Sequence, residues 1–250
     1  MAKKAKVKTE KVEVAADSAI DPLRHLSVFD PAVFGSQQID VIGVGATGSR
    51  IALQLVKLGV SNIHLWDFDK VEAHNIANQM FSQKDIGKPK VEALAEILSA
   101  HAGIVPTIHN ERVNGSQKLG DVVFLLTDTM SSRKEIWNGA LKMKLSTKLV
   151  VETRMGVDEG RIYAFNPMLP SNNKAFEATL YDDEKVVEQS ACGSTITVGP
   201  TADVVAGLAV WAFVKWFNLG QKKADAAELE NEILFALRPP TFITRKFKEF

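Results

Sequence analysis

The chain has 250 residues, 46% of them hydrophobic, which is enough apolar material for one large α/β domain or two small ones. Thirty basic and thirty acidic residues cancel, so the net charge favours neither a nucleic-acid partner nor a membrane surface, and we expect neither. The single cysteine, Cys192, excludes an internal disulfide and a multi-cysteine zinc site. We therefore expect a cytoplasmic protein without structural zinc.

The N-terminal segment, residues 1–19, contains clustered lysines and no large aromatic side chain. Such a segment buries too little apolar surface to offset the entropy lost on ordering, so we expect a disordered basic tail. The remaining residues, 20–250, are expected to form a single domain.

From residue 39 onwards, short apolar runs alternate with segments of helical periodicity. Strands are predicted at 39–43, 62–67, 104–109, 121–127, 147–153 and 160–165, and helices at 47–58, 88–101, 131–142 and 200–218. This alternation predicts an α/β fold of the doubly wound type, in which helices cover both faces of a mainly parallel sheet.

The pattern fails between the last predicted strand and the last predicted helix. Residues 166–194 contain turn residues and a carboxylate cluster with little periodicity, so we expect a long crossover loop. The apolar run that follows is broken by Pro200, Asp203 and Lys215, which favours a buried helix over a membrane span. Beyond it the sequence predicts a short helix or strand, a break at Pro239 and Pro240, and a basic, aromatic end.

Three glycines, Gly43, Gly45 and Gly48, form a G-x-G-x-x-G motif between a predicted strand and a predicted helix. In this context the glycines allow a tight turn, and the helix N-terminus offers free N–H groups to phosphate. Asp67 ends the second predicted strand, where a carboxylate can accept hydrogen bonds from ribose. These residues predict a Rossmann-like nucleotide site, and close packing of the glycines is the alternative.

The residues that follow Asp67 are not needed by an ordinary dehydrogenase. They comprise a second acid, three amides and a lysine pair, namely Asp69, Asn75, Asn78, Gln79, Lys88 and Lys90. Amides and lysines donate hydrogen bonds and positive charge to phosphate oxygens during nucleotidyl transfer. The set therefore favours adenylation with ATP over hydride transfer.

Asp128 ends the fourth predicted strand, at the sheet edge where open α/β folds bind ligands. A carboxylate facing phosphates suits Mg²⁺, which prefers one or two carboxylates together with phosphate oxygens and water. Capping of the helix that begins near Ser131 is the alternative role for Asp128.

Taken together, these motifs resemble the E1-like activating-enzyme superfamily, which includes the ThiF and MoeB adenylyltransferases and the adenylation domains of ubiquitin-activating enzymes. The resemblance covers residues 41–219. It rests on the glycine loop and on the strings "DFDKVEAHNIANQ", "DIGKPKVEAL", "LLTD" and "CGSTITVGPTADVVAGLAV". No single piece is specific, but the set is.

The resemblance implies binding of ATP and Mg²⁺, and adenylation of the C-terminal carboxylate of a small ubiquitin-like or sulfur-carrier protein with release of pyrophosphate. By the same resemblance, Asp67 would bind ribose, Asn75 and Gln79 would border the phosphates, Lys90 would contact phosphate, and Asp128 would hold Mg²⁺. It also implies a homodimer, formed around the long apolar helix that contains Trp211 and Trp216.

Two positions leave the family chemistry open. Asn78 stands where the family usually has an arginine, and candidates for a replacement cation are Lys88, Arg50, Arg154 and Arg24, the last reaching a partner subunit. Cys192 lies where some relatives have a nucleophilic cysteine, and a small residue at a buried loop-to-helix junction is the alternative interpretation.

Two alternative functions follow from these residues. The change at Asn78 and the missing zinc ligands are compatible with a non-catalytic E1-like module that binds nucleotide or peptide. The glycine loop and Asp67 alone are compatible with an NAD-dependent oxidoreductase.

Overall fold

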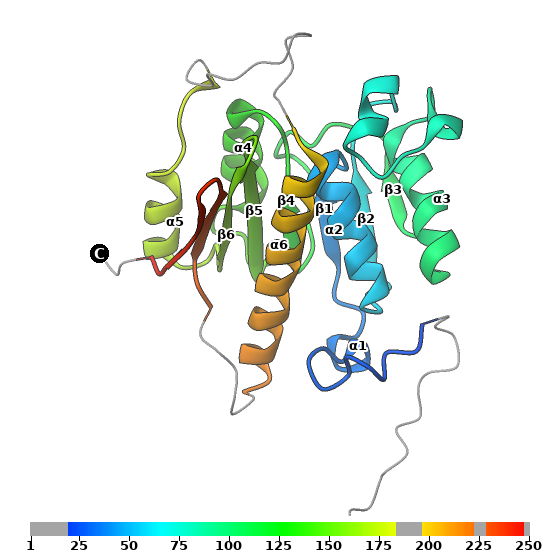
Figure 1. Ribbon diagram of the computed structural model, residues 1–250. Coiled ribbons are helices and arrows are strands. Elements are labelled where there is room, and N and C mark those ends of the chain that lie inside the picture. Colours follow the sequence, from blue (N-terminus) through cyan, green and yellow to red (C-terminus); the bar gives the residue numbers. More distant parts are fainter. Residues whose placement is uncertain (1–19, 184–196, 223–228, 248–250) are drawn as a thin grey trace, which may run out of the picture.

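A computed structural model of the protein describes residues 20–183, 197–222 and 229–247 (Figure 1). The predicted tail at 1–19 and Cys192 lie outside the described residues. The helices are α1 (Pro31–Phe34), α2 (Ala46–Lys57), η1 (Ala73–Ala77), η2 (Gln83–Asp85), α3 (Lys90–Ala102), α4 (Met130–Ile136), η3 (Trp137–Leu141), α5 (Pro170–Glu177) and α6 (Gly199–Gly220). The strands are β1 (Ile39–Ile42), β2 (Ile63–Trp66), β3 (Thr107–His109), β4 (Val122–Leu125), β5 (Leu149–Met155), β6 (Glu159–Phe165), β7 (Glu232–Leu237) and β8 (Pro240–Arg245).

One eight-stranded sheet runs through the molecule in the order β3-β2-β1-β4-β5-β6-β7-β8. The first five strands of this order are parallel, and β6, β7 and β8 continue it antiparallel. The predicted doubly wound fold with a mainly parallel sheet is confirmed. Because the chain leaves β1 towards β2 on one side and later returns to β4 on the other, the carboxyl ends of β1 and β4 flank the switch point where such folds bind ligands.

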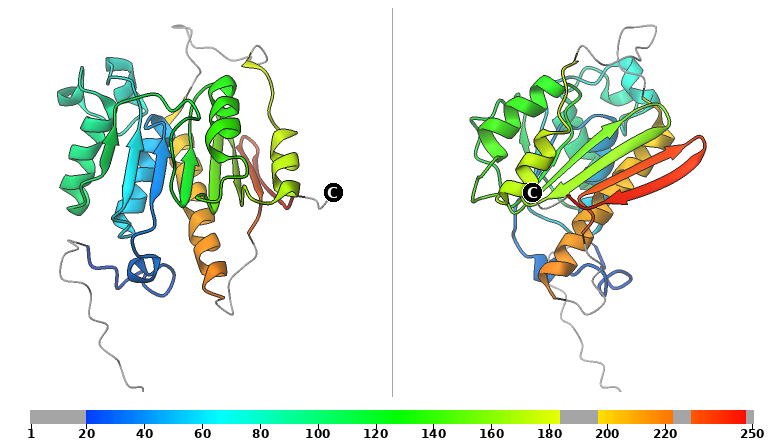
Figure 2. Two further views of the ribbon diagram at one scale, coloured as in Figure 1. Left: turned by 180° about the vertical axis from the view of Figure 1, so that it is seen from behind. Right: turned by 90° about the vertical axis from the view of Figure 1, so that its left-hand side faces the viewer.

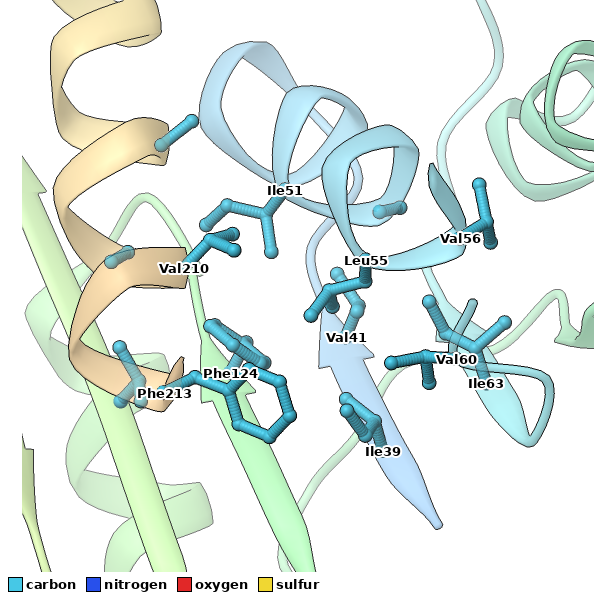
Figure 3. Close-up of a cluster of buried hydrophobic side chains, with 14 of the residues drawn as sticks. Ile39, Val41, Ile51, Leu55, Val56, Val60, Ile63, Phe124, Val210 and Phe213 are labelled. Carbon is cyan, nitrogen blue, oxygen red and sulfur yellow. The ribbon is translucent and has the colours of Figure 1, made fainter. Parts of the chain in front are cut away.

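Helices cover both faces of this sheet (Figure 2). On one face α2, α3 and α6 pack over strand residues such as Val41 and Phe124, and on the other α4, η3 and α5 pack over residues such as Val123 and Val150. Figure 3 shows Ile51 and Leu55 of α2 on the first face, with strand side chains beneath them. The central strands β1 and β4 are therefore buried on both sides, as their continuous apolar sequences predict.

The long helix α6 belongs to the protein core. It packs against α2, β5 and β6, and Val205, Ala209 and Phe213 are fully buried. Among the described helices it is the one long and apolar enough to cross a membrane, but half of its most apolar window is buried inside the protein. Its apolar character is thus explained by core packing over that half.

The structure corrects the prediction of an irregular segment at 166–194, because eight of these residues form α5. Pro170 occupies the first turn of the helix, where its missing N–H costs nothing. Phe176 is fully buried, with its ring 4.8 Å from that of Phe165 and 5.0 Å from that of Trp137. Tertiary packing of one aromatic side chain therefore stabilises a helix whose own sequence lacks a strong period.

The C-terminal region is a β-hairpin, which the sequence predicted in part. The expected short helix or strand is β7, and the Pro239–Pro240 pair does not end the structure but leads into β8. Pro240 is the first residue of an edge strand, a position where proline removes no hydrogen bond from a central ladder. Ile233 and Phe235 of β7 are buried against the core, which anchors the hairpin.

Candidate functional site

The glycine loop follows β1 directly and turns the chain into α2. Gly43 has φ +90°, and a Cβ added there would lie 2.8 Å from the carbonyl oxygen of Leu126, which follows β4. A Cβ on Gly48 would overlap the carbonyl oxygen of Gly43. A side chain at either position would clash with the backbone, so both positions require glycine. The loop and the N-terminus of α2 lie at the switch point.

Asp67 lies directly after β2 and faces this loop. Its carboxylate accepts hydrogen bonds from the backbone N–H of Val44 at 2.8 Å and of Asp69 at 2.9 Å. Burial raises the pKa of the Asp67 carboxyl above its usual value, against the opposing effect of the Lys90 ammonium and the two backbone donors. Asp67 thus links the glycine loop to the segment after β2.

Lys90 is the first residue of α3, and its ammonium donates to the Asp69 carboxylate at 2.8 Å. The Lys90 side chain is 9% exposed, whereas that of Asp69 is 50% exposed. The backbone N–H of Lys90 also donates to the Asp69 carbonyl at 2.9 Å. A buried cation is therefore held beside Asp67 by a partner that faces solvent.

The amides predicted to border the phosphates lie in and after η1. Asn75 is buried, and its side-chain oxygen accepts from the N–H of Glu72 at 2.9 Å, closing a capping box. Gln79 lies beside the glycine loop, because a Cβ on Gly45 would lie 3.9 Å from its Nε2. Asn75 therefore shapes the segment, while Gln79 faces the loop.

Asn78, the position at which the resemblance leads us to expect an arginine, makes a structural contact. Its Nδ2 donates to the hydroxyl and the carbonyl of Thr197, which lies just before α6 and is the first residue of the second described range. Its own backbone carbonyl accepts from Arg50 at 2.7 Å. Asn78 thus ties η1 to the start of α6.

The four candidate cations lie in different places. Arg50 pairs with Asp203 at 2.5 Å beside Asn78, whereas Lys88 pairs with Glu96 at 2.6 Å on α3. Arg154 is buried against Glu152, and its guanidinium donates to Thr179. Arg24 is exposed in the turn before α1, a helix at the opposite edge of the sheet (Figure 1). Arg50 is the candidate nearest to Asn78.

Asp128 follows β4 at the switch point, and its side chain is exposed. The cap of α4 is Thr129, whose side chain accepts from the N–H of Ser132, so the alternative role of Asp128 as the helix cap is wrong. Within the described part of the chain, the Asp128 side chain has no hydrogen bond. Its carboxylate is therefore available to a ligand at this edge.

Asp183 was not singled out from the sequence. Its carboxylate accepts from the N–H groups of Met130 at 2.5 Å and Ser131 at 3.0 Å, which begin α4. Hydrogen bonding by Ser131 lowers the pKa of the Asp183 carboxyl below its usual value. This contact fixes Asp183, the last residue of the first described range, near Asp128.

Arg133 is the second residue that sequence reasoning missed. It is buried in α4, and its guanidinium donates to the carbonyls of Thr127 and Thr153 and pairs with Glu152 at 2.9 Å. A signal was present, since Arg133 shares a helical face with apolar Met130 and Trp137. A charged residue on such a face must have a buried partner.

Several buried polar atoms at this edge fit a polar ligand. The side-chain oxygens of Asn78, Gln79 and Thr127 are buried without a hydrogen-bond partner among the described residues. Buried polar atoms are normally paired with protein or with bound molecules. In the described ranges no three His, Cys, Asp or Glu side chains group as a metal site. One exposed carboxylate, Asp128, suits a Mg²⁺ ion whose other ligands are phosphate and water.

The chain is similar in sequence to known proteins. A model of the ThiF family matches residues 32–246. The sulfur carrier protein ThiS adenylyltransferase of Escherichia coli is 28% identical over 204 residues, which cover 77% of this chain and 78% of that protein. Ubiquitin-like modifier-activating enzyme 5 of Caenorhabditis briggsae is 24% identical over 86% of this chain, which spans 55% of that enzyme.

A solved structure of similar fold is E. coli MccB, crystallised with AMPCPP and MccA. It has a TM-score of 0.66 and 16% sequence identity, over 88% of this chain and 66% of that chain. At this identity the likeness shows the fold alone. The chain spans about two thirds of MccB.

Proposed function

Because the chain belongs to the ThiF family, we propose that it uses ATP to adenylate the C-terminal carboxylate of a small ubiquitin-like or sulfur-carrier protein. The observation that supports this most is the gathering of the glycine loop, Asp67, Lys90 and Asp128 at one sheet edge. ThiS adenylyltransferase and ubiquitin-like modifier-activating enzyme 5, whose names state such substrates, are among its relatives.

The reaction assigns a distinct task to each of these groups. A carboxylate oxygen attacks the α-phosphorus of ATP, the bond from that phosphorus to the bridging oxygen breaks, and pyrophosphate leaves. The glycine loop and the N-terminus of α2 receive phosphate oxygens, and Asp67 accepts from ribose. Lys90, kept at the edge by Asp69, donates to a phosphate oxygen as negative charge develops.

The chemistry of Mg²⁺ fits the exposed carboxylate of Asp128. When bound there and to phosphate oxygens, the ion would neutralise phosphate charge and orient the leaving group. The unpaired oxygens of Asn78, Gln79 and Thr127 support a polar ligand at the same edge, and the hydroxyl and amino groups of a nucleotide are donors that such oxygens can accept from.

Replacing Asp128 by asparagine tests this proposal. Carrier-dependent pyrophosphate release is expected to fall at least about 100-fold in D128N, because a metal ion contributes several kcal/mol of transition-state stabilisation. Asp21→Asn is the control, since Asp21 is an exposed carboxylate in the turn before α1. Equal pyrophosphate release by D128N and the wild-type protein would remove Asp128 from the proposed site.

Transfer of the activated acyl group to Cys192 would extend the reaction. The thiolate attacks the acyl carbon, AMP leaves, and a thioester forms. Cys192 lies outside the described residues, so this step rests on the sequence. A carrier adduct that survives denaturation and is cleaved by added thiol is expected in the wild-type protein and absent in Cys192→Ser. An adduct of the same yield in C192S would contradict it.

Two other functions are distinguished by nucleotide binding. A non-catalytic module is favoured by the contact of Asn78 with Thr197, because the side-chain amide of Asn78 makes a structural hydrogen bond there. Such a module would bind ATP in calorimetry without releasing pyrophosphate in the presence of any carrier. An NAD-dependent oxidoreductase would bind NADH and not ATP.

We also propose that the protein forms a homodimer through α6. Trp211 is 51% exposed on this helix, whereas Trp216 is partly buried against Phe213 with ring centroids 6.1 Å apart. An exposed tryptophan on a helix that is buried only in part supports a contact with a second subunit.

A further inference from the structure

Arg133 connects the ends of two neighbouring parallel strands. The last residue pair between β4 and β5 joins Leu125 to Glu152. Beyond it, the Arg133 guanidinium donates to the Thr127 carbonyl through Nε at 2.9 Å and Nη2 at 2.5 Å, and Nη2 also donates to the Thr153 carbonyl at 3.0 Å. The guanidinium therefore joins the two strands by hydrogen bonds beyond their last backbone residue pair.

A buried counter-ion fixes this guanidinium. Glu152 is fully buried, and it pairs with Arg133 Nη1 at 2.9 Å and with Arg154 Nε at 3.1 Å. A charge in such surroundings is tolerated when it is paired and hydrogen-bonded. The planar fork of an arginine serves two carbonyls and a carboxylate at once, whereas a lysine ammonium has no such fork.

This contact is what holds the residue before Asp128. The Thr127 hydroxyl is buried without a partner among the described residues, so the Thr127 side chain adds no hydrogen bond there. Asp128 itself is exposed and makes no side-chain hydrogen bond within the described ranges. No side-chain contact fixes the Asp128 carboxylate, so its place at this edge depends on the backbone, and on the β4 side that backbone is held through the Thr127 carbonyl.

We propose that Arg133 is a positioning residue for Asp128. By holding the backbone beside Asp128, Arg133 sets how strongly Mg²⁺ and ATP increase each other's binding affinity. This inference rests on the proposed function, because it takes Asp128 as the carboxylate that faces Mg²⁺. Arg133 acts through the backbone of Thr127 and contacts neither nucleotide nor ion.

The test compares ATP affinity with and without Mg²⁺. ATP is titrated calorimetrically into the full chain, in Mg²⁺ and in EDTA, with no carrier protein present. In Arg133→Lys the gain in ATP affinity on adding Mg²⁺ is expected to fall about tenfold, the size typical of residues that orient metal ligands. Affinity in EDTA is expected to stay at the wild-type value, because the glycine loop and Asp67 are untouched.

Arg154→Lys is the matched control. It changes the other arginine paired with Glu152 but leaves the contact between Arg133 and Thr127 in place. Its gain in affinity on adding Mg²⁺ is expected to equal that of the wild-type protein. If R133K lost ATP affinity equally in Mg²⁺ and in EDTA, Arg133 would have a general structural role and the proposal would be overturned. The same conclusion would follow if R154K lost as much of the Mg²⁺-dependent gain in ATP affinity as R133K.

Two further measurements keep the test decisive. If R133K does not fold, Arg133→Gln, which places no ammonium in the buried site, is titrated instead and is expected to lose at least as much of the Mg²⁺ effect. In the wild-type protein, Mg²⁺ added to the ATP complex is expected to slow amide exchange at residues 127–130. Unchanged exchange there contradicts the premise that Asp128 faces Mg²⁺ and overturns this proposal, whereas no ATP affinity in the wild-type protein overturns the proposed function as well.

Discussion

At the scale of single residues, Asp67 shows how burial and hydrogen bonding act against each other. Burial raises the pKa of its carboxyl, and the Lys90 ammonium and the N–H groups of Asp69 and Val44 lower it in part. In the proposed site the ionised carboxylate would accept hydrogen bonds from ribose, so nucleotide affinity is expected to depend on this balance.

The raised pKa predicts an acid limit for nucleotide binding. As the pH falls through the pKa of Asp67, the carboxyl is protonated, and ATP affinity is expected to fall at a higher pH than an ordinary aspartate would cause. Calorimetry of ATP binding from neutral to acid pH measures this profile. Asp67→Asn is expected to bind ATP more weakly at neutral pH and to lose the pH dependence of ATP affinity. If the variant kept the wild-type pH profile, a group other than Asp67 would be responsible for it.

The residues that the sequence could and could not reveal differ in how they act. Gly43, Asp67 and Asp128 belong to short local patterns, so their places at the sheet edge were predictable. Arg133 and Asp183 also make contacts with residues far away in the chain, Thr153 being 20 residues from Arg133 and Met130 being 53 residues from Asp183. No local pattern specifies such a partner, although a charge on an apolar helical face indicates that one exists.

At the scale of elements, α5 and the C-terminal hairpin show the limit of periodicity. The parallel strands and their helices were predicted because each has a strong pattern of its own. In α5 only Asn173 and Phe176 are buried, so the helix has too few buried positions for a periodic signal. In β8 all six residues are exposed, and its pairing with β7 determines its conformation.

The packing account of α5 predicts the cost of truncating its buried aromatic side chain. Phe176→Ala is expected to lower the free energy of unfolding by about 3–5 kcal/mol, because a fully buried ring leaves a cavity. Denaturant unfolding followed by circular dichroism measures this change. Leu169→Ala, at an exposed side chain next to α5, is expected to change stability by less than about 0.5 kcal/mol. Similar values for both variants would show that α5 does not depend on Phe176.

At the scale of the whole molecule, one sheet brings together residues from distant parts of the chain. The edge formed by the carboxyl ends of β1, β2 and β4 carries the glycine loop, Asp67 and Asp128. At the other end of these strands lies α1 (Figure 1). Arg24 belongs to the turn that precedes this helix. Within one subunit Arg24 is therefore remote from the candidate site, and a role for it requires a second subunit.

The proposed homodimer predicts a change in mass on altering α6. Trp211→Glu places a charge on its exposed face and is expected to shift sedimentation from dimer to monomer, because an unpaired charge is costly in an apolar contact. Leu145→Glu is the control, since Leu145 is 86% exposed in the loop after η3. A wild-type monomer, or a W211E dimer as strong as the wild-type one, would rule out a contact centred on Trp211.

The central claim is that this sheet edge transfers AMP from ATP to a carboxylate. Exchange of labelled pyrophosphate into ATP, measured with small carrier proteins that end in Gly-Gly, tests it most directly because exchange requires reversible formation of the acyl adenylate. We predict exchange that depends on both the carrier and Mg²⁺, and that is lost in Asp128→Asn. No exchange with any such carrier, from a protein that also fails to bind ATP, would contradict the claim.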